Sequence, residues 1–401
     1  MKTRVRFAAI VAVLALLIGF LTERELTRGL SFDALLSLRH MIFGDRHPAE
    51  TPQVVVVNVD EATFDVPPFK KPFALWAPEF ASVLDAVETA GAKTIGVDLI
   101  FATTVETEPA LRGYDRPLRA SLARLASANK IVLAETDAGG EVFGPHETYR
   151  RTRVIDATIR SANVHIGLDG VVRYVPLWHG IDEARKPSFA LAVAERSGFD
   201  TSRLPASMRY LAPNYGDVFV APVYAMHDVH QCAVTGGTGP LAKAFSGKIV
   251  LLGADFDVED RKVTSGRAFL ASSKPQTLSC GTGTDAKRIA RRSIPGVFIH
   301  AQAVNDLLRD DIARLWPGWS ALLAFATMAT AGSAFSIFLR AQTARLLLTG
   351  TLLLWAAGTV ASALLDWFAP LLGGVTAAVA AFLIGLGLRT FVIDRERRRM
   401  A

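Results

Sequence analysis

The sequence lacks the short motifs that mark most catalytic and nucleotide-binding sites. Its glycine-rich stretches at 236–239 and 281–283 are not followed by the Lys-Ser/Thr pair that grips phosphate and metal in a P-loop. It also has no zinc-ligand spacing, no Ser-His-Asp pattern and no glycine elbow around a serine. We therefore expect no enzyme in these residues and no cofactor.

Cysteine is scarce as well, because the 401 residues include only Cys232 and Cys280. Both fall in the region that we place outside the cytoplasm below, where an oxidising compartment permits a disulfide. Two positions in a sequence say nothing about their distance in space, so a bridge and two free thiols both remain open.

Charged residues make up only 20% of the chain, whereas hydrophobic residues make up 50% and the mean hydropathy is +0.29. These values are too apolar for an ordinary soluble protein of this length. The apolar stretches lie at residues 7–21, 320–339, 346–365 and 370–388. Each is about as long as a helix that crosses the roughly 30 Å of bilayer hydrocarbon. We expect four transmembrane helices, the first an uncleaved anchor because no small-residue cleavage site follows it.

Lysine and arginine are missing from the loop 366–369 but gather at the other ends of the apolar stretches. They are Lys2, Arg4, Arg6, Arg340, Arg345, Arg389 and the arginines of 395–399. The positive-inside rule places these residues, and therefore both termini, in the cytoplasm of a cell with a bacterial-type inner membrane. The net charge of +6 and the pI of about 9.4 reflect these flanks, which favour anionic lipid rather than nucleic acid.

The orientation divides the chain into four parts. Residues 1–22 form the anchor, and 23–318 form a long extracytoplasmic domain. Residues 319–389 form a three-helix transmembrane region, and 390–401 a basic cytoplasmic tail or the start of a linker.

Apolar strand-like runs alternate with amphipathic helical patterns in the outward region. Strands are expected at 54–59, 92–101, 131–135 and from 247, and helices at 25–42, 78–90, 118–130, 187–198 and 294–310. The helix at 25–42 is expected to rise from the membrane. Strand, helix and strand at this spacing indicate βαβ units and a mainly parallel sheet.

Asp169-Gly170 lies between two strand-like runs and predicts a two-residue hairpin, which we expect to add an antiparallel edge to the parallel core. The expected fold class is therefore an α/β extracytoplasmic domain, mainly parallel with helices and an added hairpin, plus four transmembrane helices.

Acidic residues stand at the ends of three expected strands: Asp60 followed by Glu61, then Asp98, then Glu135. The carboxyl ends of parallel strands form a common rim where ligands bind, so these acids are candidates for a ligand site. The alternative is that strand-end acids cap the amides of the following helix or loop.

A metal site is a second hypothesis for the same acids. Its hard oxygens would come from Asp60, Glu61, Asp98, Asp255, Asp257 and Asp260. Their spacing matches no EF-hand, so the sequence leaves metal binding open.

Seven strings, taken in order, resemble the second-type CHASE domain, an extracellular sensory module associated with cyclases and histidine kinases. They are residues 32–39, 54–64, 90–101, 169–177, 187–194, 248–254 and 294–308. The resemblance spans nearly the whole chain and implies three transmembrane helices after the sensor, followed by a cytoplasmic output domain. The segment 72–78 departs from the Trp-Pro-Trp-like string of the family.

The resemblance implies a binding or architectural role for the matching polar positions, which are Asp60, Asp98, Asp169, Arg173 and the loop of Asp260. An arginine on a strand can hold a carboxylate with two hydrogen bonds, whereas Asp169 suits turn chemistry. Our ligand-site hypothesis therefore comprises Asp60, Glu61, Asp98, Glu135, Arg173 and Asp260. His300 stands in an apolar helix face, where a packed histidine is the commoner outcome and a pH-sensing role the alternative.

Together these features predict a membrane-bound sensor that acts as a homodimer. It would detect an unknown extracytoplasmic ligand or protein and signal through its transmembrane helices to a cytoplasmic output of adenylate cyclase or kinase type, missing from this chain. The alternative is a stand-alone envelope protein whose outward domain is a protein-interaction module. A metal-dependent extracytoplasmic enzyme is a third alternative.

Overall fold

The computed structural model describes residues 2–43, 53–180, 185–205, 208–211, 213, 221–256, 261–268, 276–281, 293–310 and 312–400. The chain divides into two compact units. One, the helical unit, consists of Met1–Gly44, Gly167–Asp169 and Ala313–Ala401, and the other, the α/β unit, consists of Asp45–Ile166 and Gly170–Ile312.

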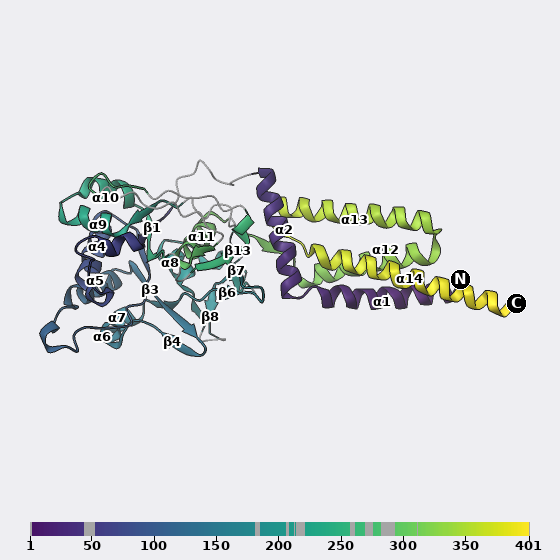
Figure 1. Cartoon of the computed structure of the whole chain (residues 1–401), viewed down its shortest axis with the longest axis horizontal. Helices are drawn as coiled ribbons and strands as arrows, with labels where there is room; N and C mark the ends of the chain where they lie inside the picture. Colours follow the sequence, from purple (N-terminus) through teal and green to yellow (C-terminus); the bar gives the residue numbers. More distant parts are fainter. Residues whose placement is uncertain are drawn as a thin grey trace. The chain divides into compact units, whose positions relative to one another are not determined.

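The α/β unit is built on a seven-stranded main sheet in the order β11-β1-β12-β2-β3-β4, with β5 also paired to β3 (Figure 1). Every pairing in it is parallel except that of β3 with β4. The strands are β1 (Val54–Val59), β2 (Thr94–Asp98), β3 (Ile131–Ala138), β4 (Glu141–Phe143), β5 (Ile159–Ser161), β11 (Val223–Ala225) and β12 (Ile249–Ala254). The expected α/β organisation is present.

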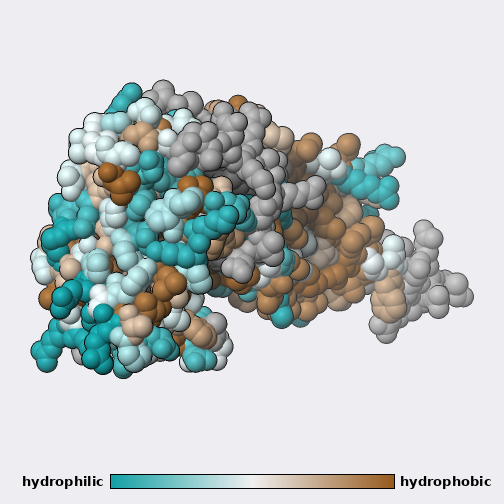
Figure 2. Space-filling model, turned by 60° about the vertical axis from the view of Figure 1, so that its left-hand side comes forward, coloured by the Kyte–Doolittle hydropathy of each residue, from teal (hydrophilic) through white to brown (hydrophobic). Residues whose placement is uncertain are grey.

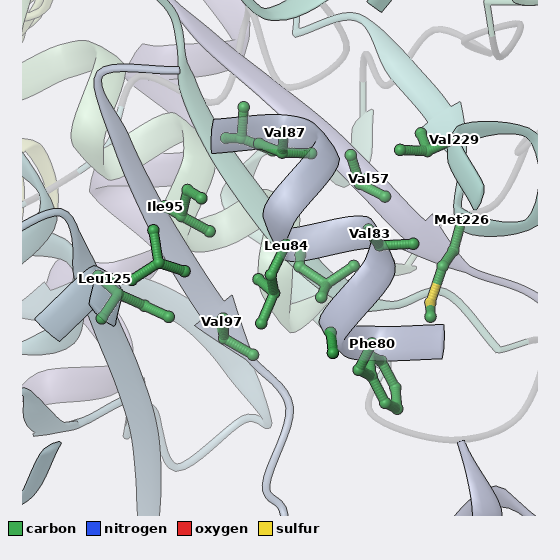
Figure 3. Packing of buried hydrophobic residues seen from close by; sticks show 14 of the residues in the cluster. Val57, Phe80, Val83, Leu84, Val87, Ile95, Val97, Leu125, Met226 and Val229 are labelled. Carbon is green, nitrogen blue, oxygen red and sulfur yellow. The ribbon is translucent and has the colours of Figure 1, made fainter. Parts of the chain in front are cut away.

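Helices pack on both faces of the main sheet, which explains why all six residues of β1 are buried. On one face Val55 and Val57 join a core cluster with α4, α5 and α9 (Figure 3). On the other face α8 and α11 approach so closely that β12 carries Gly253 against Val297 of α11. The helices are α3 (Glu61–Asp65), α4 (Ala77–Thr89), α5 (Arg116–Ser127), α6 (Glu147–Arg150), α7 (Arg153–Asp156), α8 (Phe189–Arg196), α9 (Met226–Val234), α10 (Thr238–Phe245) and α11 (Gly296–Arg309).

Helix α4 shows how local sequence sets these elements. Pro78 occupies its first turn, and Gly91, at a φ of +89°, follows its carboxyl end. The buried face consists of Phe80, Val83, Leu84 and Val87, at helical spacing (Figure 3). Burying a side chain of this kind contributes about 2 kcal/mol, so the apolar face fixes the helix on the sheet.

The α/β unit also contains a second, five-stranded sheet in the order β10-β7-β13-β14, with β6 paired to β7. Its strands are β6 (His165–Ile166), β7 (Val171–Pro176), β10 (Tyr210–Leu211), β13 (Arg261–Thr264) and β14 (Ser293–Pro295), and β8 (Trp178–His179) pairs separately with β9 (Lys186–Pro187). The hairpin predicted at Asp169-Gly170 joins β6 to β7 and belongs to this sheet, so its assignment to the edge of the parallel core is wrong.

The antiparallel edge of the main sheet comes instead from β4. Ala138 pairs with Glu141, and the two residues between them are Gly139 and Gly140, at φ values of +65° and +88°. A two-residue turn with both φ values positive matches the twist of a hairpin, and glycine adopts it without strain. The turn between β6 and β7 is longer, residues 167–170, and only Gly170 of these has a positive φ.

The helical unit consists of α1 (Lys2–Thr22), α2 (Glu25–Phe43), α12 (Gly318–Phe338), α13 (Ala341–Leu364) and α14 (Leu371–Met400), with a short pairing of β15 (Arg314–Leu315) and β16 (Trp367–Phe368). Four segments are long and apolar enough to cross a membrane: Arg4–Thr22, Gly318–Phe338, Ala341–Leu364 and Leu371–Phe391. Hydrophobic residues make up most of the visible surface of these helices in Figure 2.

Helix α2 runs crosswise to the apolar helices of its unit rather than continuing their direction (Figure 1). Arg39 forms an ion pair of 3.0 Å with Asp366, and the ring of Phe32 lies 4.7 Å from that of Phe368. Ser31 Oγ accepts a hydrogen bond of 3.2 Å from the backbone of Leu372. These contacts hold α2 against the segment that joins α13 to α14, so its expected rise from the membrane is replaced by a crosswise course.

Candidate functional site

The carboxyl ends of β1 and β12 place two acidic side chains next to each other. Val59 pairs with Ala254, the last residue of each strand, and the next residues are Asp60 and Asp255. The amide of Asp255 also donates to the carbonyl of Val59 at 2.9 Å, which ties the two strand ends together. Ligands bind at the carboxyl ends of parallel strands. This end of the sheet, called the sheet edge below, therefore carries a carboxylate on each of these two neighbouring strands.

Asp60 caps the short helix α3. Its Oδ1 accepts hydrogen bonds from the amide of Thr63 at 2.9 Å and from the hydroxyl of Thr63 at 2.7 Å. A carboxylate at this position satisfies a backbone donor that the helix itself leaves unpaired. The capping interpretation of this strand-end acid is therefore present in the structure, and Glu61 follows it as an exposed residue of the first helical turn.

His227 extends this hydrogen-bonded chain from the start of α9. Its Nδ1 lies 3.1 Å from Thr63 Oγ1 and 4.0 Å from Asp60 Oδ1. Because the Thr63 hydroxyl hydrogen is directed to Asp60, the remaining donor in the contact is the Nδ1–H of His227. On its other side, Nε2 lies 3.7 Å from Asp228 Oδ1. A buried histidine is thus held between two carboxylates.

Asp255 is buried beside Arg261 of β13, with 3.2 Å between Oδ1 and a guanidinium nitrogen. Arg261 also donates to the carbonyl of Ser293 at 2.7 Å and to that of Phe256 at 3.2 Å. Burial raises the pKa of Asp255 to about 6, Arg261 opposes the rise, and the charges of Asp60 and Glu61 add to it. This carboxyl group therefore changes protonation close to neutral pH.

A disulfide fixes the segment 276–281 against α9. Cys232 and Cys280 are bonded, with their Cα atoms 5.1 Å apart. Gly281 follows directly, and a Cβ there would lie only 2.6 Å from the carboxyl carbon of Asp228. In the loop-entropy treatment, closing a loop of this sequence separation, 48 residues, stabilises the fold by about 4 kcal/mol. The bridge, which the sequence left open, thus holds this backbone over the Asp228 carboxylate.

Asp98 and Glu135 lie further along the same sheet. Because β12 lies between β1 and β2, the strand that ends in Asp98 is not adjacent to that of Asp60. Glu135 stands inside β3 rather than at its end, and an Arg150 guanidinium nitrogen lies 3.9 Å from its carboxylate. At about 4.8 Å per strand, β1 and β3 are separated by roughly 14 Å. The neighbour of Asp60 is therefore Asp255.

Of the remaining candidate residues predicted from the sequence, two lie away from this sheet edge and one lies outside the residues that the structure describes. Arg173 is buried in β7 of the second sheet. His300 packs in α11, where its Nε2 donates to the carbonyl of Ala162 at 3.1 Å and its ring meets that of Phe189 edge-on at 5.1 Å. Asp260, like Asp257 of the metal hypothesis, lies outside the described residues.

Sequence reasoning missed His227, Asp228 and Arg261 as members of the edge. The run Met226-His227-Asp228 follows a strand of only three residues, too short to produce a clear alternating pattern. Among the described residues no group of three or more His, Cys, Asp or Glu side chains is arranged to hold a metal ion.

The chain thus combines an α/β unit, which has polar side chains at the carboxyl ends of its parallel strands, with four helices long and apolar enough to cross a membrane. Residues 7–334 match the family model of the CHASE2 domain, which is well over half of the chain. The chain therefore belongs to the CHASE2 family, as its sequence strings indicated, and its domain is a sensory extracellular domain. No curated protein and no solved structure matches the chain.

Proposed function

We propose that this protein is a multi-pass receptor of a bacterial-type inner membrane, with both termini in the cytoplasm and the α/β unit outside it. The observation that carries the proposal is the family match from residue 7 to residue 334, which includes the first apolar helix, the whole α/β unit and most of α12. Apolar helices come before and after the sensor domain in sequence. Ligand binding to such a domain can therefore shift the equilibrium between two arrangements of the helices that cross the membrane.

The helical unit supports this orientation. Both termini and the turn between α12 and α13 lie at one end of it (Figure 1). Arg340 lies in this turn and Arg345 near the start of α13. Arg389 donates to the carbonyls of Ser336 and Leu339 at the carboxyl end of α12. Cations at this end are favourable on the cytoplasmic side.

The signal would reach a cytoplasmic output of adenylate cyclase or kinase type, on the same polypeptide or on a partner, with the receptor acting as a homodimer. Ligand binding at the carboxyl ends of β1 and β12 would act on Asp60, Asp255 and His227. His227 contacts Asp60 directly and through Thr63, and the charge of Asp60 acts on Asp255. Asp98, Glu135 and Arg173 remain candidates for a larger ligand that reaches beyond these strands.

A cyclase chimaera tests the proposal. Residues 1–401 are joined to a bacterial cyclase catalytic domain that is active only as a dimer, and cyclic AMP is measured in cells without their own cyclase. The double variant Asp60→Asn/Asp255→Asn removes both charges, while asparagine still caps α3. We expect cyclic AMP to change by about fivefold or more, the lower end of typical coupling free energies.

The matched control is Asp85→Asn/Asp156→Asn, which removes two half-exposed acids elsewhere in the α/β unit and should leave cyclic AMP unchanged. If both double variants give the same cyclic AMP at equal amounts of protein in the membrane, the sheet edge is not the ligand site. A second control replaces residues 45–312 with an unrelated folded domain. If cyclic AMP does not change even then, the result would favour the alternative, a stand-alone envelope protein whose outward domain is a protein-interaction module.

A further inference from the structure

A separate cavity in the α/β unit is lined by aromatic and basic side chains. It has a volume of about 300 Å³ and is formed by residues of β6, β7, β8 and β10 and the segments next to them. Its functional lining consists of His165, Trp178, His179, Arg185, Arg209 and Tyr210. This volume is at the lower end of the range for small-molecule sites, roughly 300–1,000 Å³.

Arg185 and Arg209 both line this cavity, and no carboxylate is among the described residues that line it. Arg185 lies with its guanidinium carbon 4.4 Å from the ring centre of Trp178 and donates to the carbonyl of Met208 at 3.3 Å. No ion pair joins Arg185 or Arg209 to a described carboxylate. A guanidinium has five N–H donors, and within the described part of the chain most of those on Arg185 have no acceptor.

The backbone holds these groups in place. Tyr210 pairs with Pro176 across β10 and β7, and the amide of Leu177 donates to the carbonyl of Arg209 at 2.9 Å. Trp178 pairs with Pro187 across β8 and β9, close in sequence to Arg185. Strand residues therefore form part of the cavity wall, and Arg185 and Arg209 each stand directly before a strand, β9 and β10.

Two rings add polar and flat surface to the cavity. His165 meets Tyr210 edge-on, with 5.7 Å between ring centres. His179 has a buried Nε2 without a hydrogen-bond partner among the described residues. Burial, together with the neighbouring His300, lowers the pKa of His179, so its ring is neutral at pH 7 and leaves Nε2 to be satisfied by a bound group.

We propose that this cavity binds a small aromatic carboxylate, with Arg185 and Arg209 holding the carboxylate and the rings of Tyr210 and His165 packing against its apolar body, one by its face and the other by its edge. A guanidinium holds a carboxylate through parallel charge-assisted hydrogen bonds. The aromatic walls and the volume leave room for more than an inorganic anion. The site goes beyond the proposed function, because it uses different residues from the sheet edge and needs no signal transfer.

Isothermal titration of the full chain in detergent with benzoate, benzamide and inorganic phosphate at equal ionic strength tests this inference. Benzamide has nearly the shape of benzoate without its charge, and phosphate has charge without an aromatic body. We expect saturable binding of benzoate alone. Binding of benzamide as tight as that of benzoate would contradict recognition of the carboxylate, phosphate binding as tight would contradict recognition of the ring, and no benzoate binding would overturn the site.

Variants place the binding in this cavity. Arg185→Gln and Arg209→Gln should each weaken benzoate binding by about tenfold or more, since each removes a charge-assisted hydrogen bond. Arg112→Gln, at an exposed position outside the cavity, should bind as the unchanged protein does. Equal affinity in all three variants would overturn the proposal. Neither the chimaera nor the orientation depends on benzoate, so the receptor proposal and this site can fail separately.

Discussion

Asp255 carries the clearest pH-dependent contribution at the sheet edge. Its pKa rises from an ordinary value of 3.8 to about 6, first because it is buried and then because Asp60 and Glu61 are negative, while Arg261 only partly compensates. Between these two values the folded protein binds the proton more tightly than the unfolded chain does. The contribution of Asp255 to the free energy of unfolding therefore falls as pH rises from about 4 to about 6.

Asp255→Asn should remove this part of the pH dependence, which amounts to about 3 kcal/mol at most, since one pKa unit corresponds to about 1.4 kcal/mol. The measurement is the denaturant midpoint of the full chain in detergent at several pH values between about 4 and 6, with unfolding monitored by tryptophan fluorescence. Asp156→Asn, which changes a half-exposed acid, is the matched control. A pH profile of Asp255→Asn that is as steep as that of the control would contradict the assigned pKa.

The role of Asp60 could be predicted from its sequence position, because an acid just after a strand and just before a helix is a common cap. Its partners could not. His227 lies 164 positions from Thr63 along the chain, and nothing local in either segment indicates that they meet. Asp255 reaches Asp60 only because β12 inserts between β1 and β2.

At the scale of elements, α12 and α14 approach each other through small residues. A Cβ added at Gly332 of α12 would collide with the carbonyl of Ala378 and contact Ala381 of α14. In lipid, where both helices already have apolar surroundings, close backbone packing of small residues is a main source of helix association. Glycine at this position is therefore a packing requirement.

Gly332→Val should lower the thermal midpoint of the helical unit, with an overpacking cost of about 1–3 kcal/mol. Gly358→Val in α13 is the matched control, since a Cβ at Gly358 meets nothing within 4 Å. The measurement is thermal aggregation of the full chain in a mild detergent. If the two variants lose stability equally, close packing of α12 on α14 is not what holds this unit together.

Elements with strong local signals were predictable from sequence. The apolar run of β1 and the Pro-started, Gly-stopped helix α4 both form where expected. The second sheet was not foreseen, because its strands β6 and β10 have only two residues each and carry no periodicity. The Asp169-Gly170 hairpin was assigned to the wrong sheet because turn chemistry identifies a hairpin but does not say which sheet it joins. The antiparallel strand of the main sheet comes instead from the turn at Gly139-Gly140.

At the scale of the whole molecule, function depends on which side of the membrane each unit occupies. The family places the sensor domain outside the cytoplasm. Both termini and the basic turn between α12 and α13 lie at one end of the helical unit (Figure 1), which is the arrangement that an even number of membrane crossings produces. Every other part of the proposed receptor follows from this orientation.

Cysteine labelling in intact bacterial cells tests the orientation most directly. Cys232 and Cys280 are bonded to each other and do not react with a maleimide, so single cysteines can be introduced at exposed positions. We expect Ala110→Cys, in the α/β unit, to react with a membrane-impermeant maleimide in intact cells, and Gln342→Cys, at the start of α13, to react only after permeabilisation. Labelling of Gln342→Cys in intact cells, with Ala110→Cys protected until lysis, would contradict the proposed orientation.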